Sequence, residues 1–147
     1  MLVKVSGRGT TNIGDTEFIW GKRTYVMGDV NVTDDSFSGD SLGYNADAAI
    51  EKALRFQEEG VDIIDVGGES TRPPHTYGQE AATSVTSEEE LRRVLPVISR
   101  LKGRLKVPIS IDTYKASVAE RALDEGASMV NDVWGLQADS QMAEVVA

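Results

Sequence analysis

The sequence predicts an α/β fold built on a parallel sheet. Segments with helical periodicity separate four short apolar runs, at residues 24–30, 61–67, 107–112 and 128–133. Continuous rather than alternating hydrophobicity is typical of strands that are covered on both faces. Strands that alternate with helices are joined by right-handed crossovers and therefore run parallel. A chain of 147 residues is long enough for one domain with its own core.

Residues 1–20 precede this pattern and are expected to form a small hairpin that plugs one end of the sheet. Its apolar side chains are Val3, Val5, Phe18 and Ile19. Residues 21–147 then make up the remaining domain. Its first helix is predicted at residues 45–59, where Asn45 can serve as N-cap and Gly60 as the stop. The stripe it would bury consists of Ala46, Ile50, Ala53, Leu54 and Gln57.

The second helix is predicted to begin with a capping box of Ser87 and Glu90. Pro96 inside it predicts a kink, and the run Glu88, Glu89, Glu90 is interpreted as acidic residues that satisfy the helix dipole. The apolar stripe of this helix is Leu91, Val94, Leu95, Ile98 and Leu101. The polar, proline-led segment 73–86 before it is expected to be a long loop.

The third helix is predicted to start at a Thr113 cap and to end at Gly126, with Val118, Ala119, Ala122 and Leu123 buried. A fourth helix is expected to begin near Ala138. Four βα units are half of an eightfold barrel, and a half barrel exposes two sheet edges. We therefore expect a fragment of a longer protein, or a half that pairs with another, which leaves a homodimer open. A doubly wound open sheet remains the alternative on pattern alone.

Composition narrows the classes of function. The sequence has no cysteine and one histidine, which excludes disulfides, thiolate chemistry and a multi-histidine metal cage, so any metal must bind oxygen. A formal charge of −9 with scattered Lys and Arg argues against nucleic acid. No apolar run approaches the ~18 residues of a membrane span, and no secretory signal is visible. A cytoplasmic protein with a small-molecule ligand is expected.

Polar residues follow each predicted strand. A single Asp at such a place is more often a helix cap or a turn residue, but four successive polar strand ends favour a shared site. After the second strand, Gly67 and Gly68 permit a sharp bend, which on its own is a weak signal. The strand-end residues are Asp29 and Asn31, then Asp65, Glu69, Ser70, Thr71 and Arg72, then Asp112 and Thr113, then Asn131 and Asp132.

Three of these side chains suggest specific chemistry. Thr71 offers a hydroxyl, Arg72 a planar cation suited to phosphate, and Asn31 an oxygen suited to Mg²⁺, which takes few protein ligands. His75 in the loop is expected to be exposed and unengaged. Trp20 and Trp134 are expected to be packing residues, because neither has basic neighbours arranged as a nucleic-acid groove.

Four stretches together resemble dihydropteroate synthase: MGDVNVTDDSFSGD, DIIDVGGESTRP, ISIDTYKASVAERALDEGA and MVNDV. The similarity runs from about Val26 to the last residue. It implies a (β/α)8 TIM-barrel fold of which this chain carries about the first four βα units. The implied reaction joins p-aminobenzoate to 7,8-dihydropterin-methyl diphosphate, giving 7,8-dihydropteroate and pyrophosphate in folate biosynthesis, and implies a sulfonamide target.

The resemblance also implies roles for individual residues. Asn31 matches the family's Mg²⁺-linked asparagine, and Asp112 and Asn131 match residues that bind the pterin edge. Thr71 and Arg72 match the second loop, over the diphosphate and the p-aminobenzoate pocket. The chain departs from the family pattern where Asp34 replaces a proline, where Gly39 and Asp40 reverse an Asp-Gly pair, and where Pro74 replaces a glycine.

The family's later strands supply a pterin-binding aspartate, a lysine in a Ser-Arg-Lys motif and an Arg-His pair, none of which this sequence contains. Isolated, the chain is therefore expected to be inactive or very feeble. Two alternatives stay open. One is a related pterin-binding methyltetrahydrofolate methyltransferase domain, which has little use for the loop around Thr71 and Arg72. The other is a non-catalytic half barrel.

Overall fold

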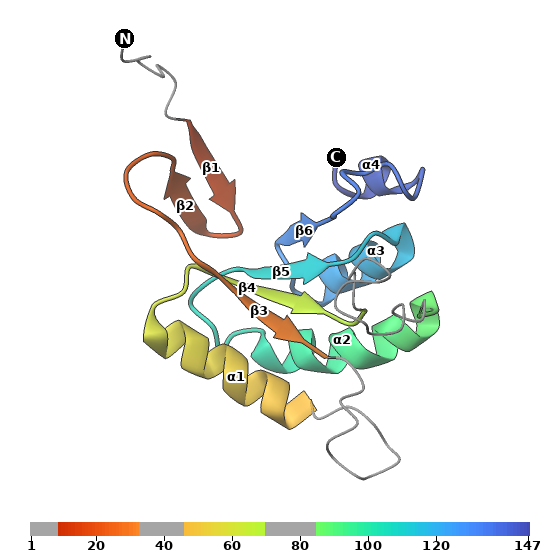
Figure 1. The fold of residues 1–147 in the computed structure, drawn as a ribbon, viewed down its shortest axis with the longest axis horizontal. Coiled ribbons are helices and arrows are strands. Elements are labelled where there is room, and N and C mark those ends of the chain that lie inside the picture. The colour runs from red at the N-terminus through yellow and green to blue at the C-terminus, as the bar shows by residue number, and fades with distance from the viewer. Residues whose placement is uncertain (1–8, 33–45, 70–84) are drawn as a thin grey trace, which may run out of the picture.

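The computed structural model describes residues 9–32, 46–69 and 85–147. Each of the four apolar runs contains a strand, and each predicted helix is present, although the fourth begins later than Ala138. Figure 1 shows the elements in chain order: β1 (Thr10–Ile13), β2 (Thr16–Ile19), β3 (Met27–Asn31), α1 (Ala46–Glu59), β4 (Ile63–Gly67), α2 (Ser87–Leu101), β5 (Ile109–Asp112), α3 (Ala116–Glu125), β6 (Met129–Asn131) and α4 (Met142–Val145).

Strands β3, β4, β5 and β6 form one parallel sheet in chain order. A doubly wound sheet would reverse its strand order at a switch point, and no reversal occurs among these strands. The α/β prediction is confirmed, and the topology is that of part of a barrel. The register aligns Asn31 with Gly67, Gly67 with Asp112, and Asp112 with Asn131.

The main core lies between one face of this sheet, which we call the helix face, and helices α1, α2 and α3. Side chains alternate across a strand, so Val30, Ile64, Val66, Ile109 and Ile111 all reach this core. Gly28 allows α1 to approach β3 closely, because a Cβ atom there would lie 2.6 Å from Phe56 Cδ2. Helix α1 ends as predicted at Gly60, whose φ is +93°.

The opposite face of the sheet, which we call the inner face, differs from the expectation of strands covered on both sides. In β3, Val30 is buried while Met27, Asp29 and Asn31 are exposed. No described helix packs over these exposed side chains. The pattern of β3 is therefore alternating, and the polar half of the alternation lies on the inner face.

Strands β1 and β2 pair antiparallel as a hairpin at the amino-terminal ends of the sheet strands. Ile13 and Phe18 pack there against Ile63 in a small separate cluster. Val3 and Val5, also expected in this hairpin, lie outside the described residues. Trp20 stacks on Phe18 at 5.9 Å between ring centroids but is still 41% exposed, so its predicted packing role is confirmed only in part.

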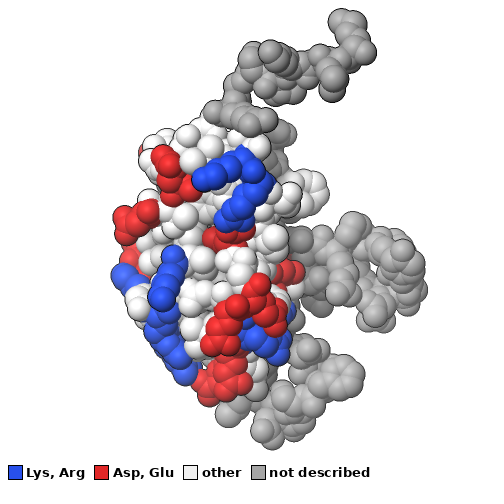
Figure 2. Space-filling model, turned by 90° about the vertical axis from the view of Figure 1, so that its left-hand side faces the viewer, with Lys and Arg blue, Asp and Glu red and all other residues white. Residues whose placement is uncertain are grey.

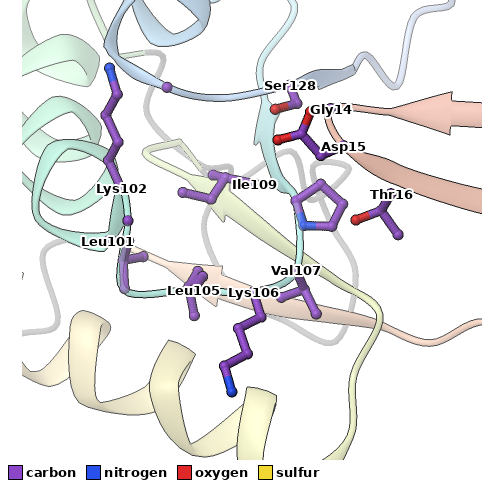
Figure 3. A pocket seen from close by; sticks show the side chains of 13 residues that line it. Gly14, Asp15, Thr16, Leu101, Lys102, Leu105, Lys106, Val107, Ile109 and Ser128 are labelled. Atoms are coloured by element: carbon purple, nitrogen blue, oxygen red, sulfur yellow. The ribbon is translucent and has the colours of Figure 1, made fainter.

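The chain from the hairpin to β3 is tied to the start of β4. Arg23 forms a two-pronged ion pair with Asp62, which also accepts a hydrogen bond from Val26 N at 2.8 Å. The hydrogen bond from Arg23 lowers the pKa of Asp62. A cavity of about 190 Å³ lies next to the hairpin turn. Asp15, Lys106 and Ser128 are among the residues that line it (Figure 3). It lies at the amino-terminal ends of the strands, away from the polar strand ends.

Two predicted helix caps are wrong by a few residues. Thr86, rather than Ser87, caps α2 and accepts a hydrogen bond from Glu89 N at 3.2 Å. Thr113 does not cap α3, because Tyr114 and Lys115 intervene before the helix begins. The first amide of that helix, Ala116 N, instead donates to Asp139 Oδ2 at 2.9 Å. Gly126 closes α3 as predicted.

The surface shows no basic patch on the side drawn in Figure 2, where the described Lys and Arg side chains lie among Asp and Glu. Trp134 contradicts its prediction, because it is 60% exposed in the turn after β6 rather than packed. Asp132 holds that turn by accepting hydrogen bonds from Trp134 N and Leu136 N. None of the described helices is long and apolar enough to cross a membrane.

Candidate functional site

The inner face of the sheet carries two adjacent rows of polar residues near the carboxyl ends of the strands. One row aligns Asp29 with Asp65 and Asp65 with Ser110. The second row, two residues farther along each strand, consists of Asn31, Gly67, Asp112 and Asn131. Residues two apart on a strand point to the same face. Three carboxylates and two amides therefore share one surface.

Asn131 and Asp65 form a hydrogen-bonded pair that connects the two rows. Asn131 Nδ2 donates to Asp65 Oδ2 at 2.8 Å. Asp65 is 5% exposed, and its second oxygen and the neighbouring Ser110 Oγ are buried without a well-formed hydrogen bond. Burial raises the pKa of Asp65, the contacts with Ser110 and Asn131 offset part of that rise, and the charge of Asp29 adds to it.

Asn31 is oriented in a similar way at the other edge of the sheet. Its Nδ2 donates to Asp29 Oδ2 at 3.0 Å. Gly67 lies between Asn31 and Asp112, and a Cβ atom on Gly67 would be 3.2 Å from Asn31 Oδ1 and 3.5 Å from Asp112 Oδ2. The missing side chain thus leaves a shallow space between the amide of Asn31 and the carboxylate of Asp112.

Asp112 lies among several other carboxylates. Burial and the nearby charges of Asp65, Asp29, Glu90 and Asp132 raise its pKa to about 6. A carboxyl group with this pKa changes its protonation state close to neutral pH. It can therefore accept or donate a hydrogen bond, depending on what binds beside it.

A buried charge cluster lies next to these rows, where β4 and β5 end and α2 begins. Lys115 Nζ is paired with both Glu69 and Glu90, and Glu90 is 1% exposed. Burial alone would lower the pKa of Lys115, but the hydrogen bonds to the two carboxylates outweigh it and the pKa is raised. Glu69 also accepts hydrogen bonds from Tyr114 Oη and Val85 N, each at 3.2 Å.

Of the five residues singled out from sequence, the structure brings three into one row: Asn31, Asp112 and Asn131. Thr71 and Arg72 lie outside the described residues, as do Ser70, Asp34, Gly39, Asp40, Pro74 and His75 and nearly all of the predicted loop 73–86. The roles of Thr71 and Arg72 stay predictions.

Sequence reasoning missed three features. Asp65 was noted only as a strand-end residue, and Ser110 not at all, although its polar side chain between two isoleucines is a signal of an inward-facing position. The acidic run Glu88, Glu89 and Glu90 lies in the first turn of α2 as predicted. The sequence did not reveal that the carboxylate of Glu90 also turns inward to Lys115.

The donor set for a metal ion is limited. In the parts of the chain that the structure describes, no group of three or more His, Asp or Glu side chains is arranged to hold a metal. A cation that keeps most of its waters needs only one or two protein oxygens. Asn31 Oδ1 meets that requirement, because the amide nitrogen is directed to Asp29 and the oxygen lies over Gly67.

Comparisons with known proteins agree on one family. A family profile described as pterin binding enzyme matches residues 27–147. The dihydropteroate synthase of Clostridium beijerinckii is 48% identical over 135 residues, which cover 92% of this chain and 48% of that protein. The chain spans about half the length of the curated relatives it matches.

Two solved structures give the same result. One is a dihydropteroate synthase from Clostridium difficile in the presence of pteroic acid, with 59% identity, a TM-score of 0.75, and coverage of 88% of this chain and 46% of that one. The other is the Xanthomonas albilineans dihydropteroate synthase with 4-aminobenzoic acid, with 42% identity, a TM-score of 0.79, and coverage of 93% and 48%.

Proposed function

Because this chain belongs to the pterin binding enzyme family, we propose that it supplies the amino-terminal half of a dihydropteroate synthase site. The observation that carries the proposal is the row of Asn31, Gly67, Asp112 and Asn131 on the inner face. Relatives that match this half of the barrel are named dihydropteroate synthase, and two were solved with pteroic acid and with 4-aminobenzoic acid.

In the proposed reaction, the amine nitrogen of p-aminobenzoate attacks the methylene carbon of 7,8-dihydropterin-methyl diphosphate. The new C–N bond forms as the C–O bond to the diphosphate breaks. Pyrophosphate leaves with the bonding electron pair, and the amine loses a proton. An aromatic amine already has a free lone pair, so the protein mainly has to position the two substrates. Sulfonamide inhibition is part of the same proposal.

The residues of the inner face divide these tasks. Asp112 and the oxygen of Asn131 are acceptors suited to the amino group and ring N–H of a pterin. Thr71 and Arg72, by resemblance, serve the diphosphate. Asn31 would hold Mg²⁺, which when bound supplies positive charge for the departing diphosphate. We propose the cytoplasm as the location on the same basis.

A chimeric enzyme tests this proposal in a complete barrel. The segment of this chain that aligns with the Clostridium beijerinckii enzyme replaces the corresponding half of that enzyme, and dihydropteroate formation is measured with and without Mg²⁺. We expect Mg²⁺-dependent turnover that Asn31→Ala reduces. A folded chimera that binds neither pterin nor pterin diphosphate would contradict the proposal.

The same chimera separates the synthase from the methyltransferase-type alternative. Binding that depends on Mg²⁺ and on the diphosphate favours the synthase, whereas binding of the pterin ring with no effect of either favours a methyltransferase-type domain. A control variant, Arg55→Met, removes an exposed ion pair with Glu59 on α1 and should leave turnover unchanged.

A further inference from the structure

Asp65 is a buried carboxylate, and moving a carboxylate out of water costs free energy. It is 5% exposed, and among the described residues no Lys or Arg side chain forms an ion pair with it. Its Oδ1 and the adjacent Ser110 Oγ are both buried without a well-formed hydrogen bond. A buried carboxylate with incomplete partners destabilises a fold. The presence of Asp65 at this position therefore indicates a role other than packing.

The geometry of its one good hydrogen bond identifies that role. An asparagine side chain has a donor end and an acceptor end that differ little in shape, so its orientation depends on its partners. A carboxylate only accepts hydrogen bonds, and Asp65 Oδ2 lies 2.8 Å from Asn131 Nδ2. With its nitrogen held there, the amide oxygen of Asn131 is not the end that faces Asp65 Oδ2, and it is left to accept a hydrogen bond from another group.

We infer that Asp65 is a positioning residue, which fixes the amide of Asn131 so that an oxygen rather than an N–H group faces the ligand. Asp65 itself does not have to touch substrate. The inference rests on the proposed function, because the ligand class it concerns is the pterin. With Asn131 oriented this way and Asp112 beside it in the same row, this end of the site presents acceptors. It selects a ligand edge that carries N–H donors.

The substitution Asp65→Asn tests this inference because it preserves shape and removes the acceptor-only character. The new amide can donate as well as accept, so Asn131 is free to turn its own N–H groups toward the ligand. The probe is 6-hydroxymethylpterin, titrated calorimetrically into the 147-residue chain. We expect the dissociation constant to rise at least about tenfold. If an N–H group of Asn131 faces an N–H group of the ligand, neither can form a hydrogen bond.

A matched control is Asp47→Asn on α1, which makes the same chemical change at an exposed ion pair with Arg100. This control should bind the probe like the unsubstituted chain. Unchanged affinity in a folded Asp65→Asn chain would overturn the inference, as would an equal loss in both variants.

Hydrogen exchange of the Asn131 side-chain amide, measured by NMR in the unsubstituted chain, tests the positioning without any ligand or variant. We expect its Nδ2 protons to exchange more slowly than those of Asn12, which is exposed on β1. Equally fast exchange would overturn the inference. If the unsubstituted chain does not bind 6-hydroxymethylpterin, the proposed ligand class fails for this chain, and the exchange rates alone then decide whether Asp65 holds Asn131.

Discussion

The two faces of the same four strands are built from opposite chemistry. On the helix face, Val30, Ile64, Val66 and Ile111 are fully buried against α1, α2 and α3. On the inner face, the neighbouring positions along the same strands are Asp29, Asp65, Ser110 and Asp112. The first set stabilises the domain, whereas the second holds carboxylates close together, which destabilises it. A change on one face should therefore affect stability, and a change on the other should affect binding.

The charge cluster of Lys115, Glu69 and Glu90 is expected to be the strongest exception to this rule, because a change of these polar residues should affect stability. Lys115→Met would leave Glu69 and Glu90 buried without their shared cation. We expect the free energy of unfolding, measured by urea denaturation, to fall by about 3–5 kcal/mol. Adding Glu90→Gln to this variant should recover part of the loss. A loss no larger than that of Arg55→Met, which removes an exposed pair, would show that the cluster does not support the fold.

Adjacent residues on β5 compare the two faces directly. Ile111→Ala removes a fully buried side chain from the helix face and should lower the free energy of unfolding by about 2–5 kcal/mol. Ser110→Ala, one residue away on the inner face, removes a buried hydroxyl that lacks a well-formed hydrogen bond and should change it by less than about 1 kcal/mol. Urea denaturation of both variants checks the difference, and equal losses would remove the distinction between the faces.

The same alternation explains what could be predicted from sequence. The strands and helix ends follow from apolar runs and from glycines such as Gly60 and Gly126, whose effects are local. Asn31, Asp112 and Asn131 could be found because they end strands. Asp65 is followed by valine inside an apolar run, and only the strand register reveals that it faces the site. Lys115 reaches carboxylates 25 and 46 residues away, which no local pattern contains.

Two glycines test the comparison through steric overlap. A Cβ atom at Gly28 would lie 2.6 Å from Phe56 Cδ2 on the helix face, so Gly28→Ala should displace α1 and lower the free energy of unfolding by about 1–3 kcal/mol. On the inner face, a Cβ atom at Gly67 meets Asn31 Oδ1 at 3.2 Å. Gly67→Ala should lower stability by less than about 1 kcal/mol and weaken binding of 6-hydroxymethylpterin. Denaturation and calorimetry on both chains measure the contrast, which would be absent if Gly28→Ala were as stable as the unsubstituted chain.

A pH dependence of stability is expected from Asp112 on the inner face. Its pKa rises from an ordinary 3.8 to about 6 in the folded chain, so between these values the folded state binds more protons than the unfolded state. The contribution of Asp112 to stability therefore falls as pH rises through this window, and the destabilisation is complete above about pH 6.

Asp112→Asn cannot ionise, so it should be more stable than the unsubstituted chain at pH 7, with an advantage that shrinks toward pH 4. Urea midpoints at several pH values check this trend. An advantage that instead grows as pH falls would mean that the inner face stabilises the ionised carboxylate, and the two faces would then differ in polarity but not in their contribution to stability.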